Sequence, residues 1–188
     1  MGINRRREED IPHKYNAAEI ELAVANYFDY RQNLIVPNVA DGMGLHECDM
    51  LVVTPSGYAT EIEIKISVSD LKADAKKSHG HSSDMIKLLY FAIPKYMAQN
   101  IEHIPSQAGV MIITRRLSYH WDYMADKKIC DGEKDYCEII RASHANKYAK
   151  KWTAADRLAL MRLSTMRIWS LKRKLRDLTA KAKEKIKP

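Results

Sequence analysis

Two acidic residues and a lysine on neighbouring segments of this sequence have the types and spacing needed for metal-dependent chemistry. Asp49 lies in HECDMLVVT, and Glu63 and Lys65 lie in YATEIEIKIS, which follows a Pro/Gly turn. Carboxylate oxygens are the ligands that Mg²⁺ prefers, while a lysine ammonium can orient an attacking water or stabilise charge that develops at phosphorus. We therefore expect Asp49 and Glu63 to surround one divalent ion, with Lys65 as the catalytic cation.

These residues must be positioned by a β-hairpin. Both segments have the composition of strands, and PSG between them predicts the turn. Side chains two residues apart on a strand point to the same face. Three isoleucines alternate with Glu61, Glu63 and Lys65 in the second arm, so we expect the charged face to lie away from the core. The alternative is a solvated outer face of a sheet, where such charges perform no chemistry.

The elements around the hairpin alternate between helical and strand patterns. A helix in NAAEIELAVANYFDY has Asn16 as its N-cap, and the strand NLIVPNV contains Pro37, which favours the edge of a sheet. After the hairpin, we expect a helix in SVSDLKADAKK, a strand in IKLLYFAI, a short helix in PKYMAQN and a strand in AGVMIIT. This order predicts an α/β fold with a mixed sheet flanked by helices. Residues 115–150 are ambiguous apart from a strand in YCEIIRA.

A long amphipathic helix is predicted to follow Thr153, because TAAD offers a capping box and apolar residues then recur at steps of three and four. We expect residues 154–171 to pack on the body of the protein. The leucine stripe also leaves open a homodimer.

Most of the positive charge lies at the end of this helix. The chain has a net charge of +7, and residues 172–188 contain eight Lys/Arg against Asp177 and Glu184, a local +6. Polyanions attract such clusters, and nucleic acid is therefore the expected partner. The residues that we expect to contact phosphates are Lys172, Arg173, Lys174 and Arg176. The alternative is a solvated helix end.

The chain divides into three predicted regions: a polar tail (1–14), one globular domain (15–152) and the long helix (153–188). No apolar run approaches the roughly 20 residues that a membrane helix needs, and the charged N-terminus lacks a secretory signal. Three cysteines cannot all pair within one chain, so reduced thiols are expected. These features predict a cytoplasmic protein that has no membrane partner.

The hairpin sequence CDMLVVTPSGYATEIEIK resembles the signature of PD-(D/E)XK nucleases, in which an Asp on one strand is followed by Glu-x-Lys on the next. Asp49 and Glu63-Ile64-Lys65 match it, whereas Cys48 replaces the signature proline, which performs no chemistry. The segments EIKISVSDLKAD, LLYFAIP and AGVMIITR are similar to those of MmcB-like DNA-repair proteins and related phage-type proteins. The resemblance covers residues 15–115, with a weaker match in 138–175.

This resemblance implies a restriction-endonuclease-like αβββαβ core and a Mg²⁺ or Mn²⁺ ion bound by Asp49, Glu63 and the carbonyl of Ile64. Many of these nucleases also use a glutamate of the first helix. Glu19 aligns better with that position, and Glu21, which shares an apolar stripe, is the alternative. The roles of the further acids in the hairpin, Glu47 and Glu61, are left open.

The implied function is a divalent-metal-dependent DNA endonuclease acting in repair, recombination or phage DNA processing, with RNA not excluded as a substrate. The residues Lys76, Lys77, His79 and His81 follow the motif and are expected to contact the nucleic-acid backbone, against an ordinary solvated loop as the alternative. The rival hypothesis for the whole protein is a non-catalytic nucleic-acid-binding module of the same fold.

Overall fold

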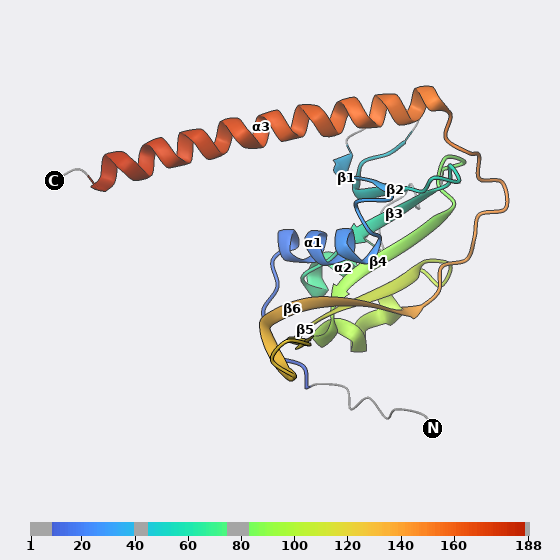
Figure 1. Ribbon diagram of the computed structural model, residues 1–188. Coiled ribbons are helices and arrows are strands. Elements are labelled where there is room, and N and C mark those ends of the chain that lie inside the picture. The colour runs from blue at the N-terminus through green and yellow to red at the C-terminus, as the bar shows by residue number, and fades with distance from the viewer. Residues whose placement is uncertain (1–8, 40–44, 75–82, 187–188) are drawn as a thin grey trace.

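A six-stranded mixed sheet forms the centre of the molecule (Figure 1). The computed structural model describes residues 9–39, 45–74 and 83–186. The strands lie side by side in chain order; β3, β4 and β5 are parallel to one another, and the other neighbours are antiparallel. The strands are β1 (Leu34–Val39), β2 (Cys48–Val53), β3 (Ala59–Ile64), β4 (Leu88–Pro94), β5 (Gly109–Asp122) and β6 (Lys127–Arg141).

Helix α1 (Ala17–Tyr27) covers one face of the sheet. Its first turn is closed by a capping box, in which the Asn16 side chain accepts the N–H of Glu19 and the Glu19 side chain accepts the N–H of Asn16. Its buried face contributes Ile20, Ala23 and Val24 to an apolar cluster with side chains of β2 to β5. The predicted helix and its N-cap are confirmed.

The opposite face carries two separate apolar clusters. One contains Leu51 of β2 together with Trp152 and Leu160, and the other contains Phe91 of β4 with residues of α2 (Val68–Asp74) and the 3-10 helix η1 (Lys95–His103). In the register of the sheet Leu51 is opposite Glu61 and Phe91 is beside Glu63. The two acids of β3 therefore lie between the apolar clusters.

The predicted α/β class, the hairpin and the edge position of β1 are confirmed. The expectation that the charged face of β3 lies away from the core is wrong, because all six residues of the strand are buried. A strand in the middle of a sheet, with a parallel neighbour, is covered on both faces. The alternation of charged and apolar residues along such a strand therefore does not show which face is exposed to solvent. The ambiguous residues 115–150 contain the long β5–β6 pair, and PKYMAQN forms a 3-10 helix.

The long helix α3 (Ala154–Ile186) contacts the body only through its beginning. Leu160 is buried and Leu163 packs against the same cluster, whereas large apolar residues from Met166 onward are exposed. Figure 1 shows the rest of α3 extending away from the sheet. The expectation that residues 154–171 all pack on the body is therefore wrong. Among the described residues, no helix combines the length and the apolar content that a membrane crossing requires.

Candidate metal centre and nucleic-acid interface

Asp49 lies where β2 and β3 separate. The main-chain ladder between them extends from Val53–Ala59 to Met50–Ile62, and beyond it the Asp49 carboxylate accepts the N–H of Ile64 at 2.7 Å. This hydrogen bond fixes the acid against the second strand of the hairpin. The Asp49 side chain is 41% exposed, so one acid of the group is open to solvent.

The ammonium of Lys65 lies between two carboxylates. Its Nζ is 2.7 Å from Oε2 of Glu63 and 3.8 Å from Oδ2 of Asp49. The side chains of Glu63 and Lys65 are only 4% and 6% exposed, and the Lys65 N–H donates to the carbonyl of Ala92 on β4. The structure thus brings Asp49, Glu63 and Lys65 together, and their two carboxylates converge on one cation.

Glu61 joins this group from two residues earlier on β3. Its side chain is 1% exposed, and Oε1 is 2.8 Å from Nε2 of His46, which precedes β2. Sequence reasoning did not assign a role to His46. Its position in HEC, three residues before Asp49 on the same arm of the hairpin, is the signal that places it near the acids of β3.

Glu21, rather than Glu19, is the acid of α1 that faces Asp49. Burial raises the pKa of Glu21, and the nearby negative charge of Asp49 raises it further; a hydrogen bond with Asn38 and the charge of Arg167 oppose the shift. Asn38 lies one residue before the end of β1 and has a left-handed backbone conformation (φ 51°). Helix α1 therefore adds a third carboxylate near Asp49.

Glu19 points into a different network. Its Oε2 accepts the N–H of Asn16, and its Oε1 lies 2.9 Å from His13 and 3.2 Å from Arg115. These contacts lower the pKa of Glu19, with the Asn16 hydrogen bond as the largest cause. The structure does not bring Glu19 to Asp49, because its capping role directs the side chain to the N-terminal end of α1. On this geometry Glu21, and not Glu19, is the acid of α1 near Asp49, while the catalytic role expected of Glu19 stays a prediction.

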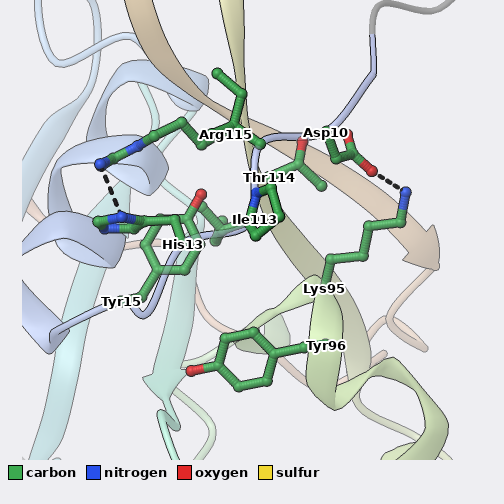
Figure 2. A pocket seen from close by; sticks show the side chains of 10 residues that line it. Asp10, His13, Tyr15, Lys95, Tyr96, Ile113, Thr114 and Arg115 are labelled. Atoms are coloured by element: carbon green, nitrogen blue, oxygen red, sulfur yellow. Dashed lines mark hydrogen bonds and ion pairs between the residues drawn. The ribbon is translucent and has the colours of Figure 1, made fainter.

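The segment before α1 is held against the middle of β5 and the start of η1. Ile11 forms a β-bridge with Arg115, and Asp10 pairs with Lys95 and Arg116. Figure 2 shows this region, where a cavity of about 250 Å³ is lined by side chains of the segment, η1 and β5, and where His13 lies beside Arg115. The part of the predicted polar tail that the structure describes is thus packed on the sheet.

The residues expected to contact nucleic acid fall into two groups. Lys172, Arg173, Lys174 and Arg176 are exposed on the projecting part of α3. The other four, Lys76, Lys77, His79 and His81, lie outside the described residues. The structure thus places one of the two groups on a solvent-accessible surface.

The donor set fits a hard divalent ion. Asp49 and Glu63 offer carboxylate oxygens that already surround a positive charge, and oxygen ligands of this kind suit Mg²⁺ and Mn²⁺. Within the described part of the chain, no three His, Cys, Asp or Glu side chains are arranged as a ready-made metal site. The groups that could hold an ion at this place are Asp49, Glu63 and the Ile64 carbonyl, with Glu21 close to Asp49.

Fold and site together define an α/β protein with a buried acid–lysine centre on the third strand of a mixed sheet. The SPO1766 protein of unknown function from Silicibacter pomeroyi has this fold, with a TM-score of 0.55, 20% identity, and coverage of 88% of this chain and 94% of that one. The family of DNA repair proteins described as MmcB-like matches residues 6–173, and the chain belongs to this family. No curated protein matches the sequence.

Proposed function

We propose that this protein is a divalent-metal-dependent DNA endonuclease of the PD-(D/E)XK type, with a restriction-endonuclease-like core. The observation that carries this proposal is the convergence of the Asp49 and Glu63 carboxylates on the buried ammonium of Lys65. Burying charges costs free energy, and hydrophobic residues of similar volume would stabilise a sheet at least as well. The retained charges are therefore better explained by chemistry than by stability.

Each member of the group has a distinct role in the proposed reaction. Asp49, Glu63 and the Ile64 carbonyl hold Mg²⁺ or Mn²⁺, which when bound polarises the scissile phosphate and lowers the pKa of a bound water. Lys65 lies within reach of both carboxylates and orients the attacking water or stabilises charge at phosphorus. Glu21 adds negative charge near Asp49.

DNA is the proposed substrate because the family is described by its role in DNA repair. The exposed basic residues of α3 support this choice, since lysines and arginines neutralise backbone phosphates whatever the base sequence. In this proposal, α3 provides affinity while the centre on β3 provides the chemistry.

A cleavage assay on linear, nicked, flapped and four-way DNA with Mg²⁺ or Mn²⁺ tests the proposal. The expected result is metal-dependent cleavage of at least one substrate, reduced by a factor of at least about 100 in Asp49→Ala and in Lys65→Ala. Glu47→Gln is the matched control, because Glu47 is an exposed acid on the same arm of the hairpin and should keep full activity. Cleavage that survives both alanine substitutions contradicts the assigned site.

A second candidate is a non-catalytic nucleic-acid-binding module of the same fold. The close pairing of Lys65 with Glu63 favours it, because a 2.7 Å ion pair satisfies both charges without a metal. This candidate predicts no Mn²⁺ binding in calorimetry, together with salt-sensitive DNA binding that is unchanged in Glu63→Gln. Metal binding that is lost in Glu63→Gln supports the enzyme instead.

A further inference from the structure

The projecting part of α3 carries a stripe of exposed large apolar side chains. The stripe residues Ile168, Leu171, Leu175 and Leu178 are 51–65% exposed. Among the described residues, the last hydrogen bond along the helix that ties it to the body is the one from Arg167 to the carbonyl of Asn38. Beyond it, no other element of the described structure covers the stripe, and Figure 1 shows this part of α3 standing away from the sheet.

The spacing of the stripe is that of a coiled-coil seam. Its residues follow one another at steps of three, four and three, which places Ile168 and Leu175 at positions a and Leu171 and Leu178 at positions d of a heptad. Two other exposed apolar residues, Met166 at position f and Trp169 at position b, lie beside the start of the seam. From residue 170 to residue 182 the large apolar residues occupy only positions a and d, a face narrower than the one with which a helix packs on a globular core or lies on a membrane. It fits one partner helix.

The charges beside the seam select the chemistry of that partner. Three of the four flanking e and g positions are lysines, namely Lys172, Lys174 and Lys181, and the fourth is Thr179. Asp177, at position c, lies on the side of the helix away from the seam. A partner whose flanking positions carry glutamate or aspartate would form ion pairs along both edges.

A second copy of this chain is disfavoured as the occupant. In a parallel pair Arg167 at position g would face Lys172 at position e of the partner. In an antiparallel pair the basic residues at the g positions would face each other. Duplex DNA is also a poor match for the seam, because leucine side chains bury no apolar surface against charged phosphates. Arg173 and Arg176, at positions f and b, point away from the seam and stay available for nucleic acid.

We infer that the seam of α3 binds an acidic amphipathic helix of another protein in a two-helix coiled coil. This inference goes beyond the proposed nuclease function and does not depend on it, since it involves none of the residues of the centre on β3. Lys172 and Lys174 also belong to the proposed DNA contacts, so the partner helix and DNA would compete for these two lysines. In this role, the end of α3 joins this protein to a partner protein.

Binding of synthetic helical peptides to the full chain tests this inference. The first probe is a fluorescent peptide of three heptads with Ile at a, Leu at d and Glu at e and g. The second has Lys at e and g, and the third keeps Glu at e and g but has Ala at a and d. We expect the first probe to bind at least tenfold more tightly than either of the others, and to protect amides of residues 168–182 from hydrogen exchange.

The double substitution Leu171→Ala/Leu175→Ala should weaken binding of the first probe at least tenfold. Met166→Ala is its matched control, because Met166 is equally exposed (66%) but lies at position f, outside the seam. Thermal melts of both variants check that the body remains folded. Unchanged binding in the double variant, or equal binding of the Ala-containing probe, overturns the inference.

Two further measurements address other occupants of the seam. Light scattering at micromolar concentrations should show no self-association that depends on Leu171 and Leu175. Vesicles of phosphatidylglycerol and phosphatidylcholine should not bind through the seam in preference to the first probe. A seam-dependent dimer or seam-dependent vesicle binding overturns the inference in favour of that occupant.

Discussion

Strand β3 and helix α3 depart from the usual distribution of side chains in opposite directions. β3 and the residue after it bury Glu61, Glu63 and Lys65 at no more than 5% exposure, whereas α3 leaves Leu171 and Leu175 about two-thirds exposed. Charged residues are almost never fully buried unless they are paired, and large exposed apolar patches mark interaction sites. Each departure costs stability, and each therefore indicates a function that the rest of the fold does not provide.

Strand β3 and helix α3 also differ in how much of the fold surrounds them. The charges of β3 are enclosed by a central sheet, by α1 on one face and by two apolar clusters on the other. The leucines of α3 lie on a helix that no described element covers beyond Arg167. We conclude that the centre on β3 is preorganised by the fold, whereas the seam on α3 is completed by binding.

The largest expected effect distinguishes a buried lysine from an exposed one. Lys65→Met should lower the free energy of unfolding by about 3 kcal/mol, because it removes one partner of a buried ion pair. Lys174→Met on α3 should change it by less than about 0.5 kcal/mol. Urea unfolding of both variants measures the difference, and the double variant Glu63→Gln/Lys65→Met should recover part of the loss. Equal losses of stability in Lys65→Met and Lys174→Met would contradict the claim that the fold depends on the charges of β3 and not on those of α3.

The next effect concerns DNA affinity. Replacing Lys172, Arg173, Lys174 and Arg176 together by glutamine should weaken binding of duplex DNA at least tenfold at about 0.1 M salt. It should also reduce the slope of log K against log salt by about 3.6, since each phosphate contact contributes about 0.9. Fluorescence anisotropy over a salt series measures both quantities. Glu63→Gln should leave the slope unchanged, since β3 contributes chemistry rather than phosphate neutralisation. An unchanged slope in the α3 variant would contradict a DNA role for this helix.

A smaller effect separates the two glutamates of α1. Glu21→Gln should lower metal-dependent cleavage at least tenfold, whereas Glu19→Gln should leave cleavage unchanged and lower stability at neutral pH. The pKa of Glu19 is lowered in the folded state, so its contribution to stability is present above 4.5 and is lost as the pH falls through the lowered value. Thermal melts at a series of pH values should therefore show that the melting temperatures of the wild type and Glu19→Gln converge at acid pH. A loss of cleavage in Glu19→Gln alone would restore the original assignment.

The smallest effect is a contrast in reactivity within one strand. Burial raises the pKa of the Cys137 thiol to about 12, whereas Cys130 on the same strand is exposed. Cys48 is buried, whereas Cys137 is partly buried, and burial raises the pKa of the Cys48 thiol as well. Iodoacetamide at pH 8 should therefore modify Cys130 much faster than the other two, which should react only after unfolding. Mass spectrometry of digested samples identifies the modified residue, and rapid modification of Cys137 in the folded protein would show that β6 opens.

Local patterns predicted much of the fold. The N-cap Asn16, the alternation in the hairpin and the proline of β1 are short-range signals, and each element they predicted is present. The β5–β6 pair was missed over most of its length, because its outer part is exposed and lacks the apolar pattern of a buried strand.

The candidate site shows where sequence reasoning reaches its limit. Asp49, Glu63 and Lys65 could be grouped because they share a hairpin, whose register follows from the chain itself. The choice between Glu19 and Glu21 depends on the rotation of α1 against the sheet and on the position of Asn38, which no local pattern fixes. The burial of the charged face likewise depends on Trp152 and η1, which are far away in the sequence.

Calorimetric titration of Mn²⁺ into the protein without nucleic acid tests the central claim most directly. We predict that the wild type binds Mn²⁺, that Glu47→Gln binds it equally, and that Asp49→Asn binds it at least tenfold more weakly while its circular dichroism spectrum is unchanged. The partly exposed Asp49 side chain makes this substitution compatible with folding, because an asparagine oxygen can still accept the N–H of Ile64. Absence of Mn²⁺ binding in the wild type, or equal binding in Asp49→Asn, would contradict the assignment of a metal centre on β3.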